Sequence, residues 1–111
     1  MEIADTTTNG VLVLSVKGRL DASNASELEH KLLSLIDGGE RRFVIDCGQL
    51  DYISSAGLRV LLVAAKRLKS DAGQIALAAL NEHLREVIEI AGFVTIFAVY
   101  GTASDAVDAL Q

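Results

Sequence analysis

Two adjacent serines are the residues of this 111-residue chain whose type and position could do chemistry. Ser54 and Ser55 follow a polar segment and stand where a long helical pattern begins. The first turn of a helix has unpaired backbone N–H groups and a partial positive charge, so an anion placed there is stabilised. Serine is a favoured N-cap residue, and capping alone explains both hydroxyls. A serine in this place can also be a hydroxyl that another protein phosphorylates, so the residues alone leave both interpretations open.

Other catalytic chemistry has little support. The two histidines, His30 and His83, fall on the polar faces of predicted helices, and neither stands near the serine pair as a base. No cluster has metal-ligand spacing, and no glycine-rich phosphate loop follows a strand. Cys47 is expected to be a small buried apolar residue, because the adjacent Asp46 disfavours a thiolate. We therefore expect no enzyme, no metal and no cofactor; a small enzyme or nucleotide-binding protein is the alternative of another class.

Composition and charge limit the classes of binding partner and the cellular compartment that fit this chain. Half of the residues are hydrophobic, which is enough for a packed core in one domain, residues 1–111. The formal net charge of −5 argues against nucleic acid and against an anionic membrane surface. The single cysteine suits a reducing compartment, the first ten residues do not resemble a signal peptide, and the apolar stretches are too short to span a bilayer. We expect a cytoplasmic protein, whose acidity does not identify a partner but favours a locally basic one.

Alternating strand and helix patterns position the serine pair. Asn9-Gly10 predicts a tight turn between short antiparallel strands, Glu2–Thr7 and Val11–Gly18, after which Gly18-Arg-Leu-Asp21 breaks the second strand. Further strands are predicted over Arg41–Cys47, Gln74–Leu80 and Val94–Tyr100. Four helices are predicted. The first runs from Ala25 to Gly38 with Ser23 or Asn24 as cap, and the second covers Leu58–Leu68 in a pattern that opens near Ser55. The third runs from Asn81 to Gly92, and the fourth covers Ala103–Leu110 with Thr102 or Ser104 as cap.

This order indicates an α/β fold: a mixed, mostly parallel sheet of about five strands with an antiparallel edge hairpin, and about four helices. In such sheets the working loops lie beyond the carboxyl ends of the parallel strands. Two of these loops are predicted over Gly18–Asn24 and Gly48–Ser55. If their strands are neighbours, Asp21 and the serine pair share one end of the sheet. Tyr52, in the second loop, is either an exposed contact residue or packed onto the core.

Four segments resemble one family. Asp51-Tyr-Ile-Ser-Ser-Ala-Gly-Leu-Arg-Val-Leu62 resembles the signature of STAS domains, specifically the stand-alone anti-sigma-factor antagonists. Gly18-Arg-Leu-Asp21 matches the turn before the family's first helix, Phe43-Val-Ile-Asp46 its central strand, and Asn81–Val87 with Gly92-Phe93 its third-helix region. The resemblance covers nearly the whole chain, and the four segments occur in the family's order and spacing.

The resemblance implies a bacterial switch protein of transcription regulation, without catalysis of its own. Unphosphorylated, such an antagonist binds an anti-sigma factor that is also a serine kinase, which frees the sigma factor. The kinase, which binds the ATP, then phosphorylates one serine and breaks the complex; a PP2C-type phosphatase restores it. Alignment with the family puts that serine at Ser55, with Ser54 as the alternate. The implied partner-binding residues are Asp21, Asp51, Tyr52, Ser54, Ser55, Gly57 and Arg59, of which Gly57 is expected to let the backbone approach the phosphate.

The chain departs from the family pattern on both sides of Ser55. The position before it is often aspartate and is Ser54 here, and the position after it is often serine or threonine and is Ala56 here. STAS domains also occur in sensing, transport and lipid-trafficking complexes. The alternative function is therefore a non-catalytic subunit of such a complex, in which the serine only caps the helix.

Overall fold

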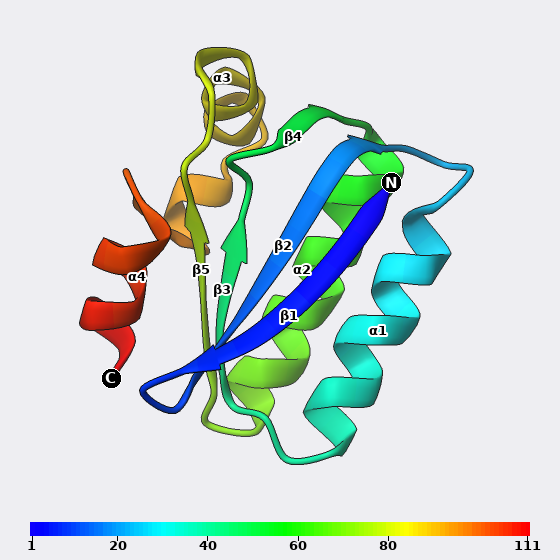
Figure 1. Cartoon of the computed structure of the whole chain (residues 1–111). Helices are drawn as coiled ribbons and strands as arrows, with labels where there is room; N and C mark the ends of the chain where they lie inside the picture. Colours follow the sequence, from blue (N-terminus) through cyan, green and yellow to red (C-terminus); the bar gives the residue numbers. More distant parts are fainter.

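A computed structural model describes residues 1–111, with six strands, four α-helices and one 3₁₀ helix (Figure 1). The strands are β1 (Glu2–Thr8), β2 (Val11–Leu20), β3 (Arg42–Asp46), β4 (Leu50–Ile53), β5 (Gln74–Ala78) and β6 (Ala98–Tyr100). The helices are α1 (Ala25–Asp37), α2 (Ser55–Ser70), α3 (Glu82–Ile90), the 3₁₀ helix η1 (Phe93–Thr95) and α4 (Ala103–Leu110). None of the helices combines the length and the apolar composition needed to cross a bilayer.

The sheet has the strand order β1-β2-β3-β5-β6, and β4 pairs with β2 beside this path. β1 and β2 are antiparallel, and every other pair is parallel. Asn9 and Gly10, between β1 and β2, both have positive φ, +52° and +79°. This is the backbone of a tight hairpin turn, and the predicted edge hairpin is confirmed.

Two layers of helix cover the sheet. α1 and α2 lie against one face, where side chains of β2 and β3 such as Leu14, Phe43 and Ile45 pack with them. α4 lies against the other face and covers Val44 of β3 and its neighbours. Since consecutive residues of a strand point to opposite faces, the fully buried run Phe43-Val44-Ile45 is explained by helices on both sides.

The structure corrects the expected end of the second strand. β2 does not stop at Gly18 but continues to Leu20, with a register shift between Gly18 and Arg19. Gly18 has φ +94°, a conformation that favours glycine, so it accommodates a bulge and not a strand end. From Gly18 to Leu20, across the bulge, the strand has a second parallel partner in β4.

The expected loop Gly48–Ser55 contains this partner strand, which brings the sheet, expected to have about five strands, to six. Leu50 and Ile53 are buried, whereas Asp51 is exposed. Burial does not alternate along these four residues, so periodicity does not reveal the strand, and pairing with β2 gives the segment its structure.

The predicted strand Val94–Tyr100 is also wrong in its first half. η1 occupies Phe93–Thr95, and only Ala98–Tyr100 joins the sheet. The rings of Phe93 and Phe97 stack with centroids 5.6 Å apart, and the Phe97 N–H donates to the Phe93 carbonyl at 2.8 Å. The two buried phenylalanines are four residues apart, a helical spacing that overrides the β preference of the segment.

Candidate partner-binding site

Ser54 and Ser55 have different structural roles at the start of α2. Ser54 has an extended backbone, and its Oγ accepts a hydrogen bond from the Gly57 N–H at 3.3 Å, so it is the N-cap. Ser55 is the first helical residue and is exposed, and its hydroxyl forms no hydrogen bond within the chain. The capping explanation therefore applies to Ser54 and leaves the Ser55 hydroxyl free.

Backbone pairing joins this helix start to the end of β2. The Ser54 N–H donates to the Leu20 carbonyl at 2.9 Å, directly after the parallel pair Leu20 and Ile53. Because Asp21 follows Leu20, the Asp21 turn and the serine pair lie at the same end of the sheet. This expectation is confirmed, although the strand that carries the serines there is β4 and not β3.

Gly57 serves packing at this junction. It is buried, and a Cβ added to it would lie 2.8 Å from Cγ of Leu20 and 2.8 Å from Cγ1 of Ile53. Only a residue without a side chain lets α2 begin so close to the ends of β2 and β4. The tight approach is therefore to the core, and Gly57 adds no exposed side chain to the surface around Ser55.

Hydrogen bonds fix the turn that carries Asp21. Oδ1 of Asp21 accepts from the Ser23 N–H at 3.0 Å and from the Ser23 hydroxyl at 2.6 Å. Oδ1 of Asn24 accepts from the Asp21 N–H at 3.0 Å, and Nδ2 of Asn24 donates to the Arg19 carbonyl at 2.8 Å. Ser23 and Asn24 thus stabilise the turn, and neither makes the predicted side-chain cap of α1. The Ser23 hydrogen bonds, assisted by the charge of Arg19, lower the pKa of Asp21 and favour the carboxylate.

Arg19 is the site residue that the sequence did not reveal. It is opposite Tyr52 in the β2–β4 pair, and its guanidinium carbon lies 4.2 Å from the centroid of the Tyr52 ring. Its Nε lies 3.9 Å from Oδ2 of Asp21. Tyr52 is half-buried, so it belongs neither to the core nor to the freely exposed surface. One available indication was that Arg19 lies within the Gly18-Arg-Leu-Asp21 turn.

The two remaining predicted residues flank this group on the surface. Asp51 lies in β4 beside Tyr52, and Arg59 lies one helical turn after Ser55 in α2. Both are exposed. Both belong to the continuous β4–α2 segment that also carries Ser55.

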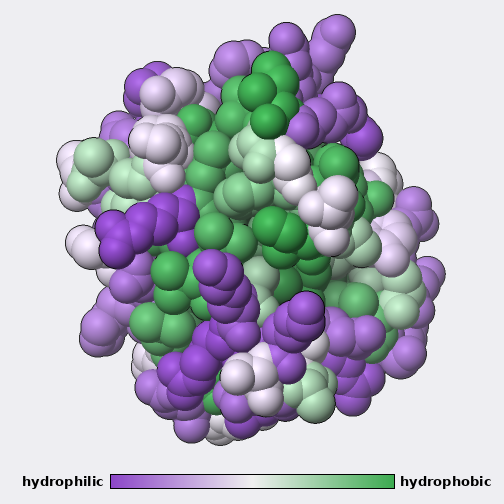
Figure 2. All heavy atoms as spheres, turned by 180° about the vertical axis from the view of Figure 1, so that it is seen from behind, coloured by the Kyte–Doolittle hydropathy of each residue, from purple (hydrophilic) through white to green (hydrophobic).

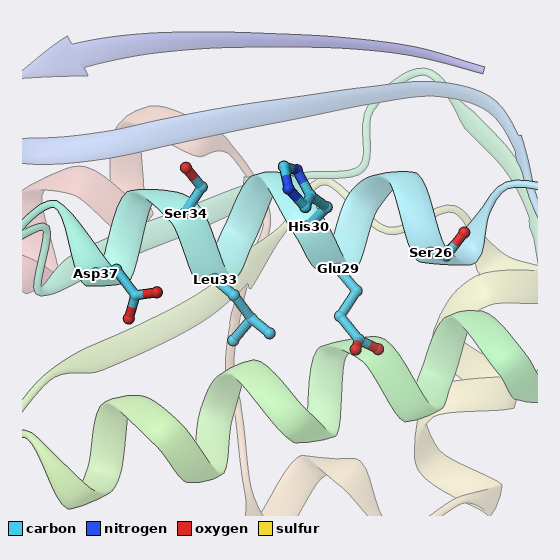
Figure 3. Close-up of a pocket in the computed structure, with 6 residues that line it drawn as sticks. All are labelled: Ser26, Glu29, His30, Leu33, Ser34 and Asp37. Atoms are coloured by element: carbon cyan, nitrogen blue, oxygen red, sulfur yellow. The ribbon is translucent and has the colours of Figure 1, made fainter.

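Other polar groups lie away from this surface. The exposed side of α1 is hollowed next to His30, but the six residues that line the hollow all belong to α1, and Figure 3 shows their side chains pointing in different directions. His83 is also exposed, as predicted. Burial, and to a smaller extent the charge of Asp46, raise the pKa of Cys47 to about 12, which agrees with the predicted buried, unreactive thiol.

The chain is similar to known proteins in sequence and in fold. The sequence model of the STAS domain family matches residues 2–106. "Putative anti-sigma factor antagonist BtrV" of Bordetella bronchiseptica is 46% identical over 103 residues, which are 93% of this chain and 89% of that protein. An anti-sigma factor antagonist from Mycobacterium paratuberculosis has a structure with a TM-score of 0.90 and 27% identity, over 98% of this chain and 92% of that one.

A third comparison concerns a protein solved in a modified state. The Bacillus cell fate determinant SpoIIAA in its phosphorylated form has a TM-score of 0.79 to this chain. The two are 20% identical, and the match covers 99% of this chain and 100% of that one. At this identity the likeness shows a shared fold.

Proposed function

The chain belongs to the STAS domain family, and from this membership we propose that it is an anti-sigma-factor antagonist switched by phosphorylation of Ser55. In its unphosphorylated form it binds an anti-sigma factor that is also a serine kinase, and the sigma factor is freed. Phosphorylation by that kinase, with ATP bound on the kinase, dissociates the complex. A PP2C-type phosphatase returns the chain to its binding form in the bacterial cytoplasm.

The free hydroxyl of Ser55 is the observation that carries this proposal. It is exposed on the first turn of a 16-residue helix whose cap is already supplied by Ser54. A kinase can therefore reach the hydroxyl without opening the fold. The N-terminal N–H groups and the helix dipole favour a phosphate at this position, so the phosphorylated chain is expected to keep its structure.

The groups around a phosphate on Ser55 explain why phosphorylation would release the partner. A phosphate brings about −1.5 to −2 charges at neutral pH. In a docked complex this charge is desolvated, and the carboxylates of Asp21 and Asp51 raise the cost further by repulsion. Each ~1.4 kcal/mol weakens the complex tenfold, so a cost of a few kcal/mol is enough to release the partner.

In this proposal the chain is a substrate and a ligand, not an enzyme. The exposed histidines lie on α1 and α3, whereas the serine pair is at the start of α2. No general base of the chain is hydrogen-bonded to the Ser55 hydroxyl to activate it as a nucleophile. The alternative of a sensing, transport or lipid-trafficking subunit requires the switched serine to be only a cap. Ser54 already supplies that cap, which favours the switch for Ser55.

The test is phosphorylation by the cognate kinase with ATP, followed by mass spectrometric mapping. We expect one phosphate on the wild-type chain and on Ser54→Ala, and none on Ser55→Ala. In a binding assay Ser55→Ala should hold the kinase permanently, and Ser55→Asp should bind weakly. Full phosphorylation of Ser55→Ala would show that the site is assigned to the wrong residue.

A further inference from the structure

A groove lies between α2 and the β5–β6 edge of the sheet, far from the serine pair. Its volume is about 530 Å³. Its apolar lining includes Leu62 and Ala65 of α2, Ile75 of β5 and Ile96 after η1. Lys66 and Lys69 of α2 line it as well. We call this hollow the α2–β6 groove.

Large apolar side chains are also exposed near the end of the segment that leads into β6. The large hydrophobic residues that the fold leaves exposed are Ile90, Val94 and Ile96, with 80%, 50% and 46% of their surface accessible. Ile90 is the last residue of α3, and Val94 and Ile96 lie between α3 and β6; Ile96 also lines the groove. Figure 2 shows apolar side chains gathered in the middle of this face, with hydrophilic side chains around them. Such a contiguous patch is typical of a protein interaction site.

The cations of the groove have no partner in the chain. Lys66 and Lys69 form no ion pair, whereas Arg67 between them pairs with Asp37 of α1 and lies 3.6 Å from Asp71. The two lysines are three residues apart and so lie on the same side of α2. In a chain of net charge −5, an apolar groove bordered by two unpaired cations is complementary to an apolar segment that carries carboxylates.

We propose that the α2–β6 groove binds an amphipathic helix of a second partner protein, apolar on one face and bordered by Asp or Glu residues. The apolar side chains of that helix would cover Ile96 and its neighbours, and its carboxylates would meet Lys66 and Lys69. Ile96 both lines the groove and is 46% exposed, so a helix seated there would cover an apolar side chain that the fold leaves open to solvent.

This second site is separate from the switch. Ser55 and Lys69 are the first and the fifteenth residues of α2, so at ~1.5 Å per residue they are about 20 Å apart along the helix. A partner in the groove is therefore outside the reach of direct repulsion by a phosphate on Ser55. The inference goes beyond the proposed function: it gives the chain a second partner that stays bound in both phosphorylation states.

A displayed library of helical peptides, selected on the full-length chain, tests this proposal. Enriched peptides should have apolar residues at helical spacing with Asp or Glu beside them. When these peptides are added to the protein, the largest changes in the protein's amide chemical shifts should occur at residues Lys66–Lys69 and Val94–Ala98. The double variant Lys66→Glu/Lys69→Glu should weaken these peptides at least tenfold. Lys17→Glu, which reverses an exposed unpaired cation of β2, should leave their affinity unchanged, and so should Ser55→Asp.

Three results would overturn the proposal. The first is selection of peptides that lack acidic residues or are insensitive to the charge reversal. The second is a concentration-dependent dimer in sedimentation that the double variant abolishes, which would assign the groove to a second copy of the chain. The third is displacement of the peptides by palmitate at stoichiometric concentration, which would assign it to a small amphiphile. Circular dichroism of each variant controls for folding.

Discussion

The guanidinium of Arg19 lies 4.2 Å from the ring centroid of Tyr52 and, through Nε, 3.9 Å from the carboxylate of Asp21. One cation thus contacts a residue of each of the two segments that meet beside Ser55. It neutralises part of the acidic surface and covers the aromatic ring. The shape that a partner meets therefore depends on Arg19 as much as on the residues that the family pattern emphasises.

A double-mutant cycle measures the Arg19–Tyr52 contact. We expect Arg19→Ala, Tyr52→Leu and the double variant to show a coupling of about 0.5–1 kcal/mol in the free energy of unfolding, because the pair is partly exposed. Urea denaturation gives the values. A control cycle pairs Tyr52→Leu with Arg85→Ala, at an exposed position of α3, and should give a coupling free energy of zero. A coupling of zero for Arg19 and Tyr52 would mean that the stacked geometry is not maintained in solution.

The two serines should differ in stability as they do in geometry. Ser54→Ala removes the N-cap of α2 and is expected to lower the free energy of unfolding by about 1 kcal/mol. Ser55→Ala removes a free hydroxyl and should change it by less than about 0.5 kcal/mol. Each variant is the control of the other, because they are the same substitution at adjacent positions. Equal losses would contradict the division of roles.

Gly57→Ala should lower the free energy of unfolding by overpacking the junction between α2 and the ends of β2 and β4. The added methyl would meet Leu20 and Ile53 at 2.8 Å, and overpacking of this kind costs about 1–3 kcal/mol. Gly101→Ala is the matched control, because a Cβ there meets nothing within 4 Å and the backbone is not left-handed. Thermal and urea unfolding of both variants provide the comparison. If the two were equally stable, the junction would be looser than described.

The Asp21 turn should respond to acid through Ser23. The hydrogen bonds of Ser23 hold the pKa of Asp21 below its ordinary value of 3.8, so the carboxylate stabilises the folded turn above that pH. This contribution is lost as the pH falls through the lowered pKa. Ser23→Ala removes the hydroxyl donor and should raise the pKa of Asp21, as followed by carboxyl-carbon NMR titration. Ser26→Ala, on the exposed side of α1, should leave the titration of Asp21 unchanged.

Much of the scaffold could be predicted from local patterns. The strand that contains the apolar run Phe43-Val44-Ile45 and the turn at Asn9-Gly10 can be recognised from residues close together in the chain, and both are found in the structure. The capping residues Asn81 and Thr102 also act locally, with their side chains accepting from Leu84 N–H at 2.8 Å and Asp105 N–H at 3.0 Å. Such features need no tertiary contact to be recognised.

The missed features depend on contacts between distant segments. β4 is a strand only because β2 continues past its bulge to meet it, and this same pairing brings Arg19 over Tyr52. The packing role of Gly57 likewise depends on Leu20, more than thirty residues away in sequence. The sequence pointed to Asp21 and Ser55 at one sheet end, but the residue between the two segments emerged only from the assembled sheet.

The backbone pairing between Leu20 and Ser54 has a consequence for the entropy of association. Both turns of the site are already held in place in the free chain, by the sheet on one side and by the Ser23 and Asn24 hydrogen bonds on the other. A partner would therefore order few backbone dihedrals on docking, and the entropic loss would be confined to surface side chains. In the proposed switch, such a preformed surface would let one added phosphate decide between binding and release, because no large folding transition would accompany binding.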